Sequence, residues 1–563
     1  MIYARFVLCL LFLIAGCTQQ LRAPSLPAPT SEGAGSLRAQ GYYDYLAAQK
    51  YVSEKQFDKA VEAYESALKV DPLSPTLLSE LAVIYLRQGK IDMALKLAEQ
   101  AIQSAPDYAP PYLLMGQLYA SKGQTGAAID AYKRVIEINP YEEDAYLLLG
   151  ALYAQDKRFN EAIEVFDQLI EMAPDNPMSL YYKARIYLDM KYYRQAEQLY
   201  GELLAAEPGF ENGLLDLAYI YEVTDRLQEA EKTYIKILAA NPTSVQARTR
   251  LGNLYMRENR ADEAIRQFSQ LVNLNRKDVE SRLKIGIIHL QQKNFEDAIN
   301  DFTFLLKEDP RYDQALYYLG TTYEEKTDYE QAIRNYRLIG PTSSIWNAAQ
   351  SRLALVFAKL KDFANSEHIL NDAIAKNPEV SDFYLYLAVV HEEANQYENA
   401  LKDLDRGLEK MPGDVELLFR KGIVLDKMGR KEEAVEVMRK VLTIDPKNAN
   451  ALNYIGYSYA EMGTNLAGAR EMITQALDIS PDDGYIMDSL GWVYFKMGQP
   501  KKALENLLEA VKRVPDDPVI LEHLGDIYLE LGNKSKASEA YRRAIENNHS
   551  EPAKIKAKLD AIK

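Results

Sequence analysis

The chain has 563 residues, of which 47% are hydrophobic and 26% charged, a composition typical of folded proteins and unlike that of disordered or collagen-like chains. Its formal net charge of −16 argues against broad binding of nucleic acid, because there is no excess of Lys and Arg to neutralise phosphates. Two Cys residues are too few for a disulfide framework or for a metal site with four thiolate ligands.

The N-terminal segment has the pattern of an export signal. Arg5 precedes an apolar run from Phe6 to Ala15, and this run is short for a permanent membrane-spanning helix. It ends Leu13-Ile14-Ala15-Gly16-Cys17, which resembles the signal of bacterial lipoproteins. The resemblance implies that residues 1–16 are a signal peptide that is removed and that Cys17 is the lipidated residue, whose acyl chains anchor the protein to a membrane.

An uncleaved anchor, or a plain secretory signal with a chance Cys, is the alternative. The other Cys, Cys9, lies inside the apolar run and would be removed, leaving one lipid-blocked thiol, which suits an oxidising compartment. In the lipoprotein family an Asp after the Cys favours the inner membrane, so Thr18 favours a lipid-anchored protein of the outer membrane that faces the periplasm. Residues 17–40 are rich in Pro, Ala, Ser and Gly, which predicts a flexible tether.

The rest of the chain is one repeated pattern. Prolines fall at positions 72, 106, 140, 174, 208 and 242, and the series resumes at 310, 378, 412 and 446. Alignment on this period gives fifteen units, from 41–74 to 518–551, with one inserted residue in the unit 449–483. All fifteen have Gly or Ala at position 8, fourteen have Ala at position 20 and eleven have Tyr at position 11. The period indicates a repeat array in place of the three or four domains that length alone suggests.

Within a unit, apolar residues recur at helical spacing, as at Leu147, Gly150 and Tyr153. Each unit is expected to hold two helices of about 13 residues. Small residues at positions 8 and 20 allow the two helices to approach closely, and the Pro at position 32 ends the second helix.

The unit Tyr146-Leu147-Leu148-Leu149-Gly150-Ala151-Leu152-Tyr153 resembles the first helix of the tetratricopeptide repeat (TPR). The resemblance covers residues 41–551; Sel1-type repeats are the near alternative, supported in one unit only. It implies an all-α, right-handed superhelical solenoid of about fifteen repeats, in which first helices line a concave face and each repeat contacts only its neighbours.

One unit departs from the pattern. The segment Leu338-Ile339-Gly340-Pro341 is expected to end a second helix early, near Ile339, which predicts a bend or hinge at 340–347. We therefore expect repeats 1–9 at 41–346 and repeats 10–15 at 347–551. Residues 552–563 have Ile555, Leu559 and Ile562 on one helical face and mostly Lys on the other, which predicts a C-terminal capping helix with a solvated face; a membrane-binding basic helix is the alternative.

The sequence contains no phosphate-binding loop, no metalloprotease motif and no nucleophile signature. We therefore expect no enzyme activity, no cofactor and no metal site. His289 and His391 both occupy position 11, where Tyr is usual, and are expected to be packing residues. Adjacent acidic pairs do not face each other on a helix, so a solvated face is the better interpretation.

In the repeat family, positions 2, 5, 9, 12 and 13 of each first helix face the groove, and these positions give three patches. The first patch contains Tyr181, Arg185, Tyr219 and Glu222. The second contains Glu324, Glu325, Glu392, Glu393 and Asp426. The third contains Asn453, Tyr457, Tyr485, Asp488, Trp492, Phe495, Glu522 and Asp526. We favour the third patch, because Trp492 and Phe495 would be aromatic anchors for a peptide; burial of Trp492 in the core is the alternative.

These features predict a non-enzymatic scaffold that binds other envelope proteins or peptides. The acidic patches favour partners with basic segments and an affinity that weakens with salt. The resemblance to outer-membrane repeat lipoproteins implies a role in assembling an envelope or export complex. Binding of glycan or peptidoglycan by the aromatic groove is the alternative.

Overall fold

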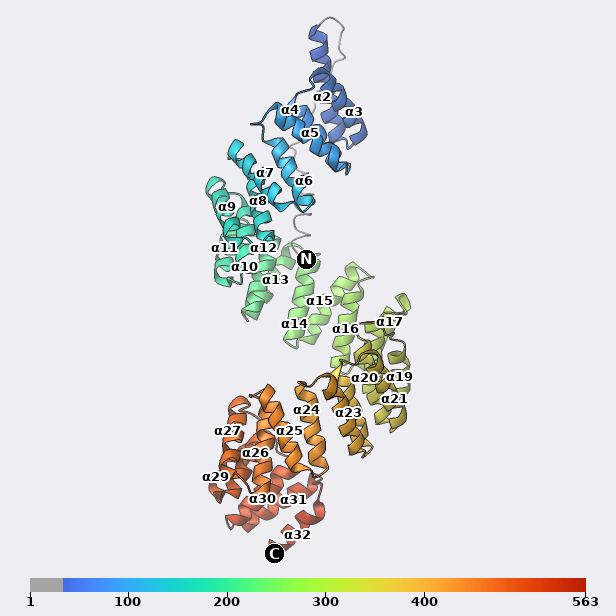
Figure 1. Cartoon of the computed structure of the whole chain (residues 1–563), viewed down its shortest axis with the longest axis vertical. Helices are drawn as coiled ribbons and strands as arrows, with labels where there is room; N and C mark the ends of the chain where they lie inside the picture. The colour runs from blue at the N-terminus through green and yellow to red at the C-terminus, as the bar shows by residue number, and fades with distance from the viewer. Residues whose placement is uncertain (1–33, 563) are drawn as a thin grey trace. The chain divides into compact units, whose positions relative to one another are not determined.

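The computed structural model describes residues 34–562, and every regular element in that range is an α-helix (Figure 1). The predicted signal peptide, Cys17 and most of the predicted tether lie outside the described residues. The chain divides into two compact units, residues 1–277 and 278–563, which are described separately below.

The helices of the first unit are α2 (Ala34–Ser53), α3 (Phe57–Val70), α4 (Pro75–Arg87), α5 (Ile91–Ser104), α6 (Pro110–Ser121), α7 (Thr125–Ile138), α8 (Glu143–Gln155), α9 (Phe159–Met172), α10 (Pro177–Asp189), α11 (Tyr193–Ala206), α12 (Glu211–Val223), α13 (Leu227–Ala240), α14 (Val245–Arg257) and α15 (Ala261–Leu274).

The helices of the second unit are α16 (Val279–Gln291), α17 (Phe295–Glu308), α18 (Asp313–Glu325), α19 (Tyr329–Arg337), α20 (Trp346–Lys359), α21 (Phe363–Lys376), α22 (Ser381–Glu393), α23 (Tyr397–Lys410), α24 (Val415–Lys427), α25 (Lys431–Ile444), α26 (Ala449–Met462), α27 (Leu466–Ile479), α28 (Gly484–Lys496), α29 (Pro500–Arg513), α30 (Pro518–Glu530), α31 (Lys534–Glu546) and α32 (Pro552–Ile562).

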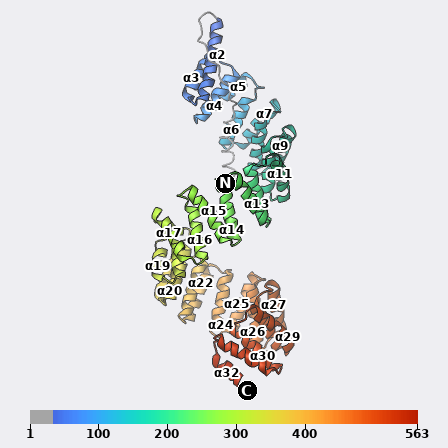
Figure 2. The ribbon, with the colours of Figure 1, turned by 180° about the vertical axis from the view of Figure 1, so that it is seen from behind.

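From α2 to α31, the described helices form fifteen consecutive pairs, one for each predicted repeat. Within each compact unit, the two helices of a pair pack on each other, as α4 packs on α5, and the second helix of a pair packs on the first helix of the next pair, as α5 packs on α6. First helices of neighbouring pairs also touch, as α20 touches α22, and the alternation within each unit can be followed from behind in Figure 2. The predicted all-α superhelical solenoid of helix pairs is therefore confirmed.

The local sequence explains where the helices begin and end. Ser74 and Asp414 each cap a first helix by accepting a hydrogen bond from a backbone N–H near its start. α9 ends at Met172, two residues before Pro174, as the proline spacing predicted. The turn inside each pair places at least one residue in the left-handed region, such as Gly532 at φ 77°, where a residue without Cβ is unstrained.

The small residue at position 8 makes room for a ring from the second helix of the same pair. A Cβ added to Gly150 would lie 2.5 Å from the ring of Phe166, and one added to Gly116 would lie 2.3 Å from the ring of Tyr132. Phe166 and Tyr132 are both buried. Close approach of the paired helices therefore depends on the missing side chain, as expected from the sequence.

Two sequence-based boundaries are revised by the structure. The expectation that residues 34–40 belong to the tether is wrong, because α2 begins at Ala34. α19 does end early, at Arg337, and is nine residues long, but the hinge expected at 340–347 stays a prediction. The division expected at 346/347 falls inside a continuous core cluster that includes Tyr336, Trp346 and Phe383. The boundary between the two compact units falls instead between Lys277 and Asp278 in the sequence.

Candidate partner-binding surfaces

The first predicted patch lies on α10 and α12 of the first unit. Tyr181 is buried; its ring packs against Phe210, and its hydroxyl oxygen accepts a hydrogen bond from Arg185. Arg185 also lies 3.3 Å from the carboxylate of Asp216. Tyr181 and Arg185 therefore hold neighbouring repeats together, and the expectation that Tyr181 faces a partner is wrong because its ring completes the packing there.

The other two residues of this patch differ from each other. Tyr219 is 40% exposed, and the guanidinium carbon of Arg250 lies 5.5 Å from its ring centre. Glu222 accepts a hydrogen bond from the hydroxyl of Tyr234 in the second helix of the same pair. Tyr219 is the member of this patch that offers an exposed aromatic ring to a partner.

The second predicted patch begins with Glu324 on α18, which is buried. Lys359 Nζ lies 2.9 Å and Arg352 Nε 3.5 Å from its carboxylate oxygens, and the hydroxyl of Tyr336 donates a hydrogen bond to it. Both cations come from α20, the first helix of the next repeat. The negative charge of Glu324 is therefore matched within the chain.

Glu392 on α22 repeats this arrangement two repeats further on. It is also buried, with Arg420 Nε at 2.7 Å and Lys427 Nζ at 2.8 Å, both from α24. The expectation that Glu324 and Glu392 attract a basic partner is therefore wrong, because the next repeat already supplies two cations to each. Of the remaining patch members, Glu325 and Glu393 are exposed and Asp426 is half-buried.

In the third predicted patch, Trp492 on α28 is 7% exposed. Its ring stacks on His523 with centroids 4.0 Å apart and on Phe495 at 5.1 Å, and its Nε1–H donates a hydrogen bond to Glu461 at 2.6 Å. The prediction that Trp492 is an exposed anchor is wrong, because the ring packs between neighbouring first helices with its one polar atom satisfied. The alternative, burial in the core, is confirmed.

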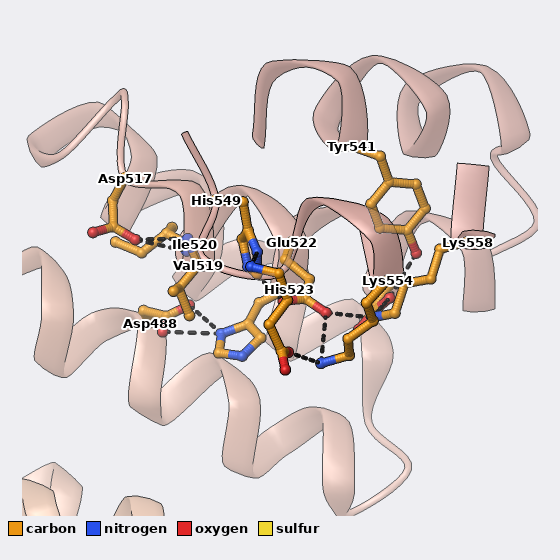
Figure 3. Close-up of polar contacts among 12 residues, drawn as sticks. Asp488, Asp517, Val519, Ile520, Glu522, His523, Tyr541, His549, Lys554 and Lys558 are labelled. Carbon is orange, nitrogen blue, oxygen red and sulfur yellow. Dashed lines mark hydrogen bonds and ion pairs between the residues drawn. The ribbon is translucent and has the colours of Figure 1, made fainter. Parts of the chain in front are cut away.

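Asp488 and His523 form a buried pair beside Trp492. His523 Nδ1 lies 2.9 Å and 3.0 Å from the two carboxylate oxygens of Asp488, as Figure 3 shows. Burial lowers the pKa of His523, but the charge and hydrogen bond of Asp488 outweigh burial, so the pKa is raised. Asp488 is thus a partner of His523 and is not itself presented to solvent.

Glu522 and Asp526 on α30 are engaged by the C-terminal segment (Figure 3). Lys558 Nζ lies 2.7 Å from Glu522 and 2.6 Å from Asp526, and Lys554 Nζ lies 3.3 Å from Glu522. His549 Nε2 lies 2.9 Å from the other Glu522 oxygen. The Lys-bearing face of the C-terminal helix, expected to be solvated, therefore lies in part against these carboxylates.

Several carboxylates together raise the pKa of Tyr457 in α26. Burial raises the pKa of Tyr457, and the negative charges of Glu461, Asp488, Glu522 and Asp426 raise it further. These four acidic residues come from α24, α26, α28 and α30. We call Asp426, Glu461, Asp488, Glu522 and Asp526 the acidic surface, which surrounds the half-buried ring of Tyr457. Asp488 and Glu522 are buried and paired within the chain, so Glu461, which is exposed, and Asp426 and Asp526, which are half-buried, form the part that faces solvent.

The remaining residues of the third patch differ in exposure. Tyr485, near the start of α28, is 55% exposed. Asn453 and Phe495 are half-buried. Tyr485 is therefore the aromatic residue of this patch that a partner can reach directly.

Sequence reasoning missed the residues that neutralise the predicted patches. Glu324 and Glu392 each have a cation 28 and 35 residues further along the chain, and this regular spacing was a usable signal. The sequence indicates Lys554 and Lys558 only as part of a charged helical face. His391 is buried beside Asp403 and His289 is half-buried beside Asp301, which agrees with the prediction that they pack.

Within residues 34–562, no group of His, Cys, Asp and Glu has the geometry of a metal site. No helix of the same range combines the length and apolar character needed to cross a bilayer.

Comparison with known families identifies the repeat. One tetratricopeptide repeat family model matches residues 51–118, 119–186, 187–244, 226–283 and 393–455, more than half of the chain. A second model with the same description matches residues 283–339, 351–415 and 489–552. The chain belongs to the tetratricopeptide repeat family, whose repeats imply a scaffold for protein–protein interaction.

Individual relatives are similar over short stretches. A TPR repeat-containing protein of Pseudomonas aeruginosa is 30% identical over 181 residues, which are 31% of this chain and 30% of that protein. A protein O-mannosyl-transferase of Mus musculus is 25% identical over 161 residues, 28% of this chain and 17% of that protein. The chain therefore spans less than a third of the length of either relative. Among solved structures, yeast Tom70 aligns with 75% of this chain and 96% of its own, at 12% identity and a TM-score of 0.38.

Proposed function

We propose that this protein is a lipid-anchored scaffold of the outer membrane that faces the periplasm and binds other envelope proteins during assembly of an envelope or export complex. The observation that carries the scaffold is the array itself: paired helices follow one another from Ala34 to Glu546. In such an array each repeat adds surface without a catalytic centre being required.

The anchor rests on the sequence Leu13-Ile14-Ala15-Gly16-Cys17 and on Thr18 after it. A lipidated Cys followed by a tether would hold the repeats near one membrane while leaving their surfaces free for partners. Partners with basic segments fit the acidic surface, because Asp426, Glu461 and neighbouring carboxylates converge around Tyr457.

Glycan binding through the aromatic groove is less well supported. The Trp492 ring that would stack on a sugar is buried between His523 and Phe495. The structure thus gives no specific observation in favour of this alternative.

The anchor is tested by replacing Cys17 with Ser. We expect Cys17→Ser to move the protein from the membrane fraction to the soluble fraction, because no acyl chain can then be attached. Cys9→Ser is the matched control: it changes a Cys within the segment that is removed, so membrane association should persist. Retention of Cys17→Ser in salt-washed membranes would contradict the anchor.

A further inference from the structure

The C-terminal helix α32 is attached less firmly than the helices before it. It packs on α31 in the place that the first helix of another repeat would take. Only Ile555 and Ile562 are buried in α32, whereas α30 buries eight residues. Because burial of apolar surface is the main stabilising contribution, α32 is held by a small apolar contact and by its charges.

The charged contact has a definite pattern. Lys554 and Lys558 are one helical turn apart and both reach Glu522, while Lys558 also reaches Asp526 (Figure 3). The hydroxyl of Tyr541 donates a hydrogen bond to Asp526 at 2.6 Å, which fixes this carboxylate from the other side.

A similar arrangement, in which one buried Glu is held by two cations of a following helix, occurs earlier in the array at Glu392. Glu392 is clamped by Arg420 and Lys427 of α24, and α24 is in turn packed against its own second helix, α25. α24 buries five residues, whereas α32 buries two. The clamp at Glu522 can therefore open with a smaller loss of buried surface than the clamp at Glu392.

Displacement of α32 from Glu522 and Asp526 would extend the acidic surface. Without α32, Glu522 would lose both Lys partners and keep His549, and Asp526 would lose Lys558 and keep the hydroxyl of Tyr541. Two carboxylates that have lost their Lys partners favour binding of a new cationic partner. These carboxylates therefore favour a partner helix that carries two Lys residues, as α32 does.

We propose that Glu522 and Asp526 form a docking site for an amphipathic helix of a partner protein, with two Lys one turn apart beside aliphatic residues, and that α32 is the chain's own occupant of this site, displaced when the partner binds. The inference rests on the proposed scaffold function and names its partner class. It makes the C-terminal helix an autoinhibitory cover over one end of the acidic surface.

The test uses the full chain and a fluorescent peptide with the sequence of residues 551–562. We expect weak binding to the wild-type chain, because α32 occupies the site. Lys554→Ala with Lys558→Ala weakens the resident helix, so peptide affinity should rise about ten-fold and fall as salt is added. Adding Glu522→Gln and Asp526→Asn to this variant should abolish the gain.

Two controls isolate the ion pairs. Lys556→Ala changes an exposed Lys of the same helix and should leave peptide affinity at the wild-type value. A peptide with Glu at the positions of Lys554 and Lys558 should not bind. Equal affinity of the wild-type and the Lys554→Ala, Lys558→Ala chain, or binding that persists in the Glu522→Gln, Asp526→Asn background, would overturn the proposal.

Hydrogen exchange of the wild-type chain provides a readout that does not depend on the variants folding. Saturating peptide should speed amide exchange in α32 and leave α29 unchanged. If α32 stays protected at saturation, or if no peptide binding occurs in any chain, α32 is a fixed cap and the proposal fails. That failure would be distinguishable from failure of the scaffold proposal, since release of Cys17→Ser from membranes does not involve α32.

Discussion

At the residue scale, the Gly at position 8 of a unit lies directly against a side chain of the second helix of the same pair. An added Cβ at Gly150 would lie 2.5 Å from the Phe166 ring, and comparable contacts occur at Gly252 with Phe268 and at Gly286 with Phe302. Some units tolerate Ala at this position, for example Ala184 beside Tyr200, where both residues are buried. The missing side chain therefore matters where a side chain of the second helix lies directly over the Gly.

We predict that Gly150→Ala lowers the free energy of unfolding by about 1–3 kcal/mol, because the ring or the helix must move to relieve overpacking. Gly201→Ala is the control: Gly201 is also within a helix, but nothing lies within 4 Å of its added Cβ, so Ala should stabilise by about 0.5–1 kcal/mol. Chemical denaturation of both variants checks this. A neutral Gly150→Ala would contradict the packing account.

His391 gives a pH dependence whose sign can be worked out. Its hydrogen bond to Asp403 raises its pKa; the charges of Asp403 and Glu367 add to this and burial opposes it. Because the folded-state pKa lies above the unfolded value, this stabilisation is complete below about pH 6.5 and is lost as pH rises through the folded-state pKa.

We therefore predict that hydrogen exchange in α22 and α23 is faster at about pH 9 than at about pH 6, after correction for the intrinsic exchange rate. His391→Gln should remove this difference. His368→Gln is the control, since the His368 side chain is 71% exposed and should change nothing. A pH difference that survives His391→Gln would show that another group is responsible.

At the element scale, first helices of adjacent repeats are joined by buried ion pairs. Glu392 on α22 is held by Arg420 and Lys427 on α24, whose side chains are 31% and 48% exposed. Because both cations can partly rehydrate when the carboxylate is removed, the expected cost is moderate.

We predict that Glu392→Ala lowers the free energy of unfolding by about 1–3 kcal/mol. Its sequence neighbour Glu393 is exposed, and Glu393→Ala should change stability by no more than about 0.5 kcal/mol. Equal effects of the two substitutions in denaturant unfolding would mean that the ion pairs do not join the repeats.

Helix positions could be predicted from sequence because the repeat fixes them locally. A small residue at position 8 and a Pro at position 32 restrict where each helix can pack and end, so α9 stops at Met172 as expected. α2 was placed too late because residues 34–40 have no apolar period, and its helix begins at Ala34 through continuity with the first repeat.

At the scale of the whole molecule, the candidate site was predicted less well than the fold. The period assigns a residue to a groove position, but whether its side chain is free depends on residues one repeat further along. Trp492 is covered by His523, 31 residues later, and Glu522 by Lys558, 36 residues later. The sequence indicates such partners only where a spacing recurs, as at Glu324 and Glu392, which each have cations 28 and 35 residues later. The spacings of 31 and 36 residues at Trp492 and Glu522 do not match these.

Contacts from the following repeat also decide which residues remain exposed to partners. Tyr485 keeps 55% of its surface exposed on the helix that carries Asp488 of the acidic surface. Leu508, in the middle of α29, is also exposed but belongs to a second helix. The two residues therefore form a matched pair for comparing the two kinds of helix within the second unit.

The most direct test of the scaffold account is photo-crosslinking in intact cells, with a photoreactive amino acid placed at Tyr485 or at Leu508. We predict discrete adducts with envelope proteins from position 485, their loss in a Cys17→Ser background, and none from position 508. Equal adducts from the two positions, or no adduct from position 485 while the protein is anchored in the membrane, would contradict the account.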